Sequence, residues 1–145
     1  MIPGTPVAKQ RARRGRGGHW YTPARTREYE ELVAWHCRAR GERGDWWEEG
    51  DTVAASIVLH FRGAPRADID NYAKSILDGA VKGGLLVDDQ QVVLLNVQFV
   101  INPNDEEHAV LTVQRTGPRK KPPSEEGGSS CPYCAPDELC ALHLP

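Results

Sequence analysis

The sequence lacks any apolar run that approaches the roughly 20 residues of a membrane-spanning helix. Its N-terminus also lacks the apolar core of a signal peptide. Only four cysteines are present, and three of them lie in the last fifteen residues, unlike the disulfide framework of a secreted domain. These absences predict a cytosolic (cytoplasmic) protein, and 145 residues suffice for one domain with a small appended element.

The chain has little net charge, −2, but its charges are segregated. Residues 1–44 hold ten Lys and Arg against four Asp and Glu, whereas residues 45–117 hold five against twelve. A basic segment before an acidic centre suits a protein that holds a polyanion with one part and a metal cation with the other.

The acidic centre begins with two aspartates, Asp68 and Asp70, that lie two residues apart. In an extended chain both carboxylates would leave the same face of the backbone and reach one site. From Asp70 onward, apolar residues recur at three- and four-residue steps, which predicts an amphipathic helix. The permissive backbone of Gly83-Gly84 is expected to end that helix.

The same helix is expected to place Lys74 within reach of the aspartate pair, with Asp78 one turn later to position it. An apolar run after the helix then returns Asp88-Asp89 toward the helix start. Crowded carboxylates repel one another unless protons or a cation neutralise them. Because Mg²⁺ prefers oxygen ligands and often binds carboxylates together with a substrate phosphate, the pattern suggests phosphoryl chemistry.

The pattern D-x-D-N-x-x-K, a helix, a glycine, an apolar run and D-D-x-Q resembles the RusA family of Holliday junction resolvases. Here it reads Asp68-Ile69-Asp70-Asn71-Tyr72-Ala73-Lys74 and Asp88-Asp89-Gln90-Gln91. The resemblance covers roughly residues 2 to 115, and its spacing is specific. It implies that Asp68, Asp70 and Asp89 bind catalytic Mg²⁺ or Mn²⁺ and that Lys74 is required for cleavage.

The implied activity is metal-dependent, structure-selective cleavage of branched DNA, in which a homodimer resolves four-way junctions by paired symmetric hydrolysis. Two alternatives remain open. One is a metal-dependent nuclease that acts on another nucleic-acid structure. The other is a non-catalytic branched-DNA-binding protein in which the aspartates are structural, as helix caps, solvated ion pairs or a turn.

The basic segment is a loop without hydrophobic periodicity, and its cations are candidate phosphate contacts: Lys9, Arg11, Arg13, Arg14 and Arg16. The alternative is a solvated, disordered arm. Trp20 or Tyr21, just after the loop, would either stack on an exposed base or pack against the following helix.

The remaining pattern predicts a small mixed α/β sheet with two helices. A helix capped by Thr26 runs to Gly41, and residues 52–61 alternate as a strand. Two further strands, over residues 92–101 and 108–115, are expected to form a hairpin. A strand that the family usually has before Gly4 is almost absent here, so either the sheet edge is shortened or the true start lies upstream.

Residues 1–116 are therefore predicted to form the endonuclease domain, and residues 117–130 have linker composition. The tail, residues 131–145, carries a C-x2-C-x5-C-x2-H pattern that consists of Cys131, Cys134, Cys140 and His143. Thiolate and imidazole pairs at two-residue gaps match tetrahedral Zn²⁺, which predicts a zinc knuckle; the alternative is a disordered tail.

Overall fold

The structure is a computed structural model that describes residues 1–39 and 50–118. Apart from residues 117 and 118, the predicted linker and the predicted zinc ligands Cys131, Cys134, Cys140 and His143 lie outside the described residues. Those predictions, and the domain boundaries that depend on them, stay predictions.

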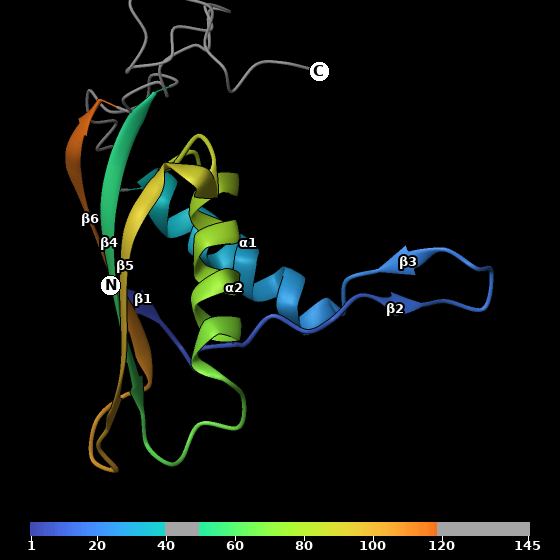
Figure 1. The fold of residues 1–145 in the computed structure, drawn as a ribbon. Coiled ribbons are helices and arrows are strands. Elements are labelled where there is room, and N and C mark those ends of the chain that lie inside the picture. Colours follow the sequence, from blue (N-terminus) through green and yellow to red (C-terminus); the bar gives the residue numbers. More distant parts are fainter. Residues whose placement is uncertain (40–49, 119–145) are drawn as a thin grey trace, which may run out of the picture.

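The described chain forms a four-stranded mixed sheet with two helices against one face (Figure 1). The helices are α1 (Ala24–Ala39) and α2 (Ile69–Lys82), and a short 3-10 helix, η1, covers Asp89–Gln91. The sheet order is β1-β6-β4-β5, with bounds Ile2–Pro3, His108–Pro118, Asp51–Phe61 and Val92–Ile101. This arrangement confirms the predicted small α/β fold. No helix among the described residues has the length and apolarity that crossing a membrane requires.

Strand β4 is the centre of the sheet and confirms the strand predicted from alternation. Its odd-numbered residues from Val53 to Phe61 are buried on the face that the helices cover, whereas the even-numbered residues are half-buried on the other face. Full burial of one Ile or Leu side chain contributes roughly 1.5–3 kcal/mol. The period of two in the sequence therefore fixes which face of β4 meets the core.

The predicted hairpin between the last two strands is wrong. β5 pairs with β4 in parallel, β6 pairs with β4 antiparallel, and β4 lies between them. Residues 102–107 thus carry the chain past the end of β4 rather than around a tight turn. β4, the strand with the most regular apolar face, therefore has a hydrogen-bonded neighbour on both edges. A hairpin between β5 and β6 would not give β4 two such neighbours.

Helix α1 begins at Ala24, two residues earlier than the predicted cap, Thr26. The Thr26 side chain is buried inside the first turn, and its hydroxyl accepts a hydrogen bond from the backbone N–H of Gln10 at 3.4 Å. The prediction of Thr26 as the cap was wrong because this hydroxyl bonds to the N-terminal segment rather than to its own helix.

The two helices pack closely where α2 carries a glycine. A Cβ atom on Gly79 would lie 2.6 Å from Cβ of Val33 on α1. Buried Glu30, also on α1, pairs with Lys9 at 3.1 Å and with Lys82 of α2. As predicted, α2 ends at the glycine pair, where Gly84 has a positive φ of 72°.

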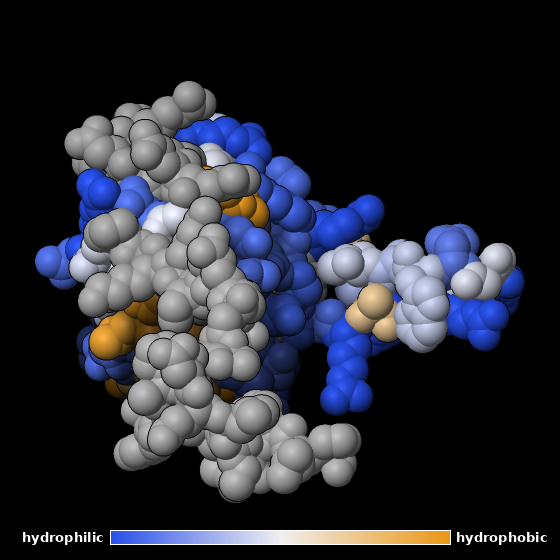
Figure 2. Space-filling view, turned by 45° about the horizontal axis from the view of Figure 1, so that its top comes forward, coloured by the Kyte–Doolittle hydropathy of each residue, from blue (hydrophilic) through white to orange (hydrophobic). Residues whose placement is uncertain are grey.

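The basic segment, expected to be an irregular loop, instead contains two short antiparallel strands, β2 (Arg13–Arg14) and β3 (Trp20–Tyr21). This basic hairpin projects from the body (Figure 1) and appears in the space-filling view as a separate, largely hydrophilic lobe (Figure 2). Gly18, with φ of 80°, lies in the turn between the strands. Hydrophobic periodicity missed it because strands of two residues carry almost no period.

Candidate active site

The first two predicted site residues lie at the start of α2. Asp68 occupies the N-cap position in extended conformation, but its side chain makes no capping hydrogen bond. Asp70 already lies in the first helical turn. Asp68 and Asp70 therefore do not lie on one face of an extended chain, as the sequence predicted. Both carboxylates are nevertheless exposed at the same end of α2. The structural alternative in which Asp68 caps the helix through its side chain is also not found.

A hollow of about 340 Å³ gathers most of the predicted residues. Asp70, Lys74 and Asp78 line it from successive turns of α2, and Asp89 enters from η1. Apolar side chains complete the wall, among them Leu95 and Val97 of β5. We call this the carboxylate hollow. The return of the chain after α2 thus brings Asp89 beside Asp70, which lies 19 residues earlier in the sequence, whereas Asp68 is not among the lining residues.

The negative charges at the hollow are not independent of one another. A side-chain hydrogen bond with Asp88 raises the pKa of Asp89 above its ordinary value, and desolvation and the charges of Asp88 and Asp78 act in the same direction. Asp88 itself caps η1, since its carboxylate accepts a hydrogen bond from the backbone N–H of Gln90 at 3.3 Å. The carboxylates of Asp88 and Asp78 thus add negative charge beside Asp89, which a bound cation would relieve.

Asp78 pairs with Lys9 and not with Lys74, contrary to the expectation that it positions Lys74. The Lys9 ammonium contacts both Asp78 and Glu30. Partial burial lowers the pKa of Lys9, but hydrogen bonds to these carboxylates outweigh it and raise the pKa overall. The structure therefore gives Lys9 a role in joining the N-terminal segment to both helices, and the DNA contact predicted for it stays a prediction.

Among the described residues, His60, Asp105 and His108 could share one metal ion, because their ligand atoms all lie within 4.8 Å of one another. The predicted aspartates do not form so tight a group in the described chain. Their oxygen-only donor set nevertheless fits Mg²⁺ or Mn²⁺, which commonly keep waters and share substrate oxygens.

Positive side chains lie on the basic hairpin and in a second hollow of the described structure. Arg11, Arg13, Arg14 and Arg16 are exposed on or beside the basic hairpin. A cleft of about 610 Å³ follows, between the N-terminal segment and residues 63–67, and its lining includes Arg25 and Arg66. Sequence reasoning missed these two arginines, although Arg66 lies just two residues before Asp68. Trp20 is 69% exposed and Tyr21 45%, so both rings keep surface that is open to solvent.

The sequence matches the protein family described as Endodeoxyribonuclease RusA over residues 3–114. Comparison with curated proteins finds no match. The family match spans both the basic hairpin and every residue that lines the carboxylate hollow.

Proposed function

The chain belongs to the RusA endodeoxyribonuclease family, and from that premise we propose that it is a divalent-metal-dependent endonuclease that resolves four-way DNA junctions. The observation that carries the proposal is the meeting of Asp70, Lys74 and Asp89 in one hollow within the family-matched region. Carboxylates and one ammonium in a shared hollow suit hydrolysis of a phosphodiester, because they can hold a cation and offset charge on the phosphate.

Asp68, Asp70 and Asp89 would hold one or two Mg²⁺ or Mn²⁺ ions. The hydrogen bond with Asp88, the desolvation and the neighbouring carboxylate charges that together raise the pKa of Asp89 support cation binding here, as does the absence of a capping bond to the Asp68 side chain. When bound, such an ion supplies Lewis-acid charge to the phosphodiester and to the attacking water. The carboxylates themselves orient that water by accepting its hydrogen bonds, and Asp88 keeps η1 and therefore Asp89 in place.

Lys74 would stabilise negative charge that develops on the phosphate in the transition state. Its side chain is exposed at the hollow, and within the described residues it makes no ion pair shorter than 4.0 Å. Asp78, the neighbouring carboxylate one turn away, is neutralised by Lys9 instead. The Lys9–Asp78 pair thus leaves the Lys74 ammonium available to the substrate.

The basic hairpin would hold the DNA backbone. Its exposed arginines can neutralise phosphates outside the cleavage site, and Arg25 and Arg66 continue the positive path along the adjoining cleft. The exposed rings of Trp20 and Tyr21 offer stacking surfaces for bases that a branch point leaves unpaired.

Two paired cuts require two sites, and a two-fold symmetric junction is matched by a C2 homodimer. Strand β5 supports this proposal because it is an edge of the described sheet and exposes apolar side chains on both of its faces, including Val93 (60%) and Leu94 (58%). We expect Leu94→Lys to convert the dimer to a monomer in light scattering after gel filtration. Gln114→Lys, an exposed position on β6, should leave the dimer intact, and a dimer that survives Leu94→Lys would place the contact elsewhere.

The function is tested by incubating a labelled four-way junction and a matched linear duplex with the protein in Mg²⁺, in Mn²⁺ and in EDTA. We expect paired symmetric nicks in the junction only when metal is present. Asp70→Asn keeps the side-chain shape but removes the charge, so it should bind the junction and cut at least about 100-fold more slowly. Glu28→Gln, which removes an exposed carboxylate from α1, should cut normally.

Two other outcomes would replace the proposal. Faster cleavage of flaps or duplexes than of junctions would assign the chain to nucleases of another substrate structure. Junction binding by both proteins without cleavage in either metal would favour the non-catalytic binding protein.

A further inference from the structure

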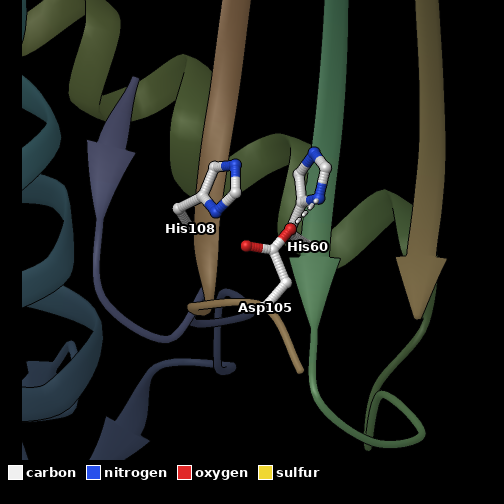
Figure 3. A group of neighbouring side chains, drawn as sticks. All are labelled: His60, Asp105 and His108. Carbon is white, nitrogen blue, oxygen red and sulfur yellow. Dashed lines mark ion pairs between the residues drawn. The ribbon is translucent and has the colours of Figure 1, made fainter. Parts of the chain in front are cut away.

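We propose that His60, Asp105 and His108 form a second metal site, one that takes a borderline transition-metal ion such as Zn²⁺. His60 lies near the end of β4 and His108 at the start of β6, and the two are direct partners in the antiparallel ladder. Asp105 comes from the connection that precedes β6, and its carboxylate lies beside the two rings (Figure 3). All three residues are half-buried, with the side chain of His60 less exposed (21%) than that of Asp105 (44%).

This site is distinct from the carboxylate hollow because the two lie on opposite faces of the sheet. His60 alternates along β4 with Leu59 and Phe61, which are buried on the helix-covered face, so its side chain leaves the other face. Leu95 and Val97, which line the hollow, pair with core-facing residues of β4 and share the helix-covered face. The sheet itself therefore separates the two groups.

The imidazole nitrogens are arranged so that lone pairs remain available. His108 Nδ1 lies 2.6 Å from the backbone carbonyl of Glu106, which can only accept, so Nδ1 carries the proton and Nε2 keeps its lone pair. His60 Nδ1 is buried without a hydrogen-bond partner and lies 3.6 Å from an Asp105 carboxylate oxygen. A buried nitrogen without a partner is uncommon, and a metal ion beside Asp105 would satisfy it.

The two rings are already ordered relative to each other. Their centroids are 4.0 Å apart and their planes differ by 12°, so the rings stack face to face. The backbone of Asp105 is held by Arg62, whose Nε donates to the Asp105 carbonyl at 2.9 Å. The stack and the anchored backbone hold the three groups close together, and one imidazole must turn out of the stack so that the in-plane lone pairs of both rings face one ion.

The donor set selects the class of ion. Imidazole nitrogen together with one carboxylate suits Zn²⁺ and similar ions, whereas Mg²⁺ prefers oxygen alone. Bonds of about 2.0–2.2 Å to a tetrahedral ion place ligand atoms roughly 3.4 Å apart. The present spread of up to 4.8 Å would thus close by about 1.4 Å, through a turn of one imidazole and a movement of the Asp105 side chain. An ion held here would tie β4, β6 and their connection together.

The test is a calorimetric titration of Zn²⁺ into the full-length protein in excess Mg²⁺, which occupies oxygen-only sites. Cys131→Ser, Cys134→Ser and Cys140→Ser are introduced throughout so that the tail carries no thiolate that could bind the ion. We expect one equivalent of Zn²⁺, with affinity reduced at least about tenfold by His60→Gln or His108→Gln. His19→Gln, an exposed histidine on the basic hairpin, should leave the affinity unchanged.

A second readout covers the case in which a histidine variant fails to fold. Asp105→Asn changes a residue outside the strands, so the sheet should form, and Zn²⁺ should raise the Tm of the parent by more than that of this variant. Co²⁺ in place of Zn²⁺ should give a visible absorption band without thiolate charge transfer, and the band should be lost in His108→Gln. Absence of Zn²⁺ binding in the parent, or equal binding by the parent, His60→Gln and Asp105→Asn, would overturn the proposal.

Discussion

The carboxylate hollow and the basic hairpin differ in how firmly the fold holds them. The hollow is assembled from α2, η1 and β5, which pack on the same core. The hairpin extends from that body on strands of two residues each, and its arginines are exposed (Figure 1). The difference indicates a division of labour, because cleavage needs fixed geometry whereas backbone phosphates can be held by an arm that adapts to the DNA.

The sharpest test of this division, with the largest expected effect, compares Asp89, which lines the hollow, with its neighbour Asp88, which does not. Asp89→Asn removes a carboxylate that lines the hollow and should slow junction cleavage at least about 100-fold with binding retained. Asp88→Asn keeps a side chain that can cap η1, so cleavage should fall less than about tenfold. Single-turnover cleavage of a labelled junction measures both, and equal losses would show that the doublet acts as one unit.

Substitutions in the basic hairpin should weaken DNA binding more than they slow cleavage. The triple variant Arg13→Ala, Arg14→Ala, Arg16→Ala should weaken junction affinity roughly 10- to 100-fold, because up to three phosphate contacts are lost. The slope of log affinity against log salt should become shallower by about 0.9 per lost contact. Saturating protein should restore near-normal single-turnover cleavage.

The matched control for the hairpin is Arg38→Ala, which removes an exposed positive charge near the opposite end of α1. It should leave the salt slope unchanged. A large loss of cleavage rate at saturation in the triple variant would contradict the division and give the hairpin a part in chemistry.

The smallest effect is expected from a change at Gly79, where α2 packs closely against α1. Gly79→Ala would place Cβ 2.6 Å from Cβ of Val33 and 2.9 Å from the Glu30 carbonyl oxygen, so the helices must separate. We expect the free energy of unfolding to fall by about 1–3 kcal/mol, measured by urea denaturation. Gly63→Ala, which meets nothing within 4 Å, should be nearly neutral.

Much of the fold was predictable because its elements carry strong local periods. The alternation of β4 and the three- and four-residue steps of α2 each identified an element and its buried face. The pairing of β5 with β4 was not predictable in this way. A strand's own sequence says which face is buried but not which edge it joins, so proximity in the chain wrongly favoured a β5–β6 hairpin.

The candidate site was also predictable only in part. The spacing of Asp70 and Lys74 places both on one helical face by itself, and the return of Asp89 followed from a short apolar run after a glycine stop. The partner of Asp78 could not be found locally. Lys9 is 69 residues away in sequence and reaches it only because the N-terminal segment crosses both helices.

The sequence alone thus determined the helical and strand periods, the segregation of charge and the D-x-D-N-x-x-K pattern that assigns the family. Tertiary structure alone decided the strand order, the pairing of Lys9 with Asp78 and the meeting of His60, Asp105 and His108. The physical reason is the distance along the sequence over which each kind of interaction acts. Local patterns follow from backbone geometry within a few residues, whereas pairings between distant segments depend on how the whole core closes.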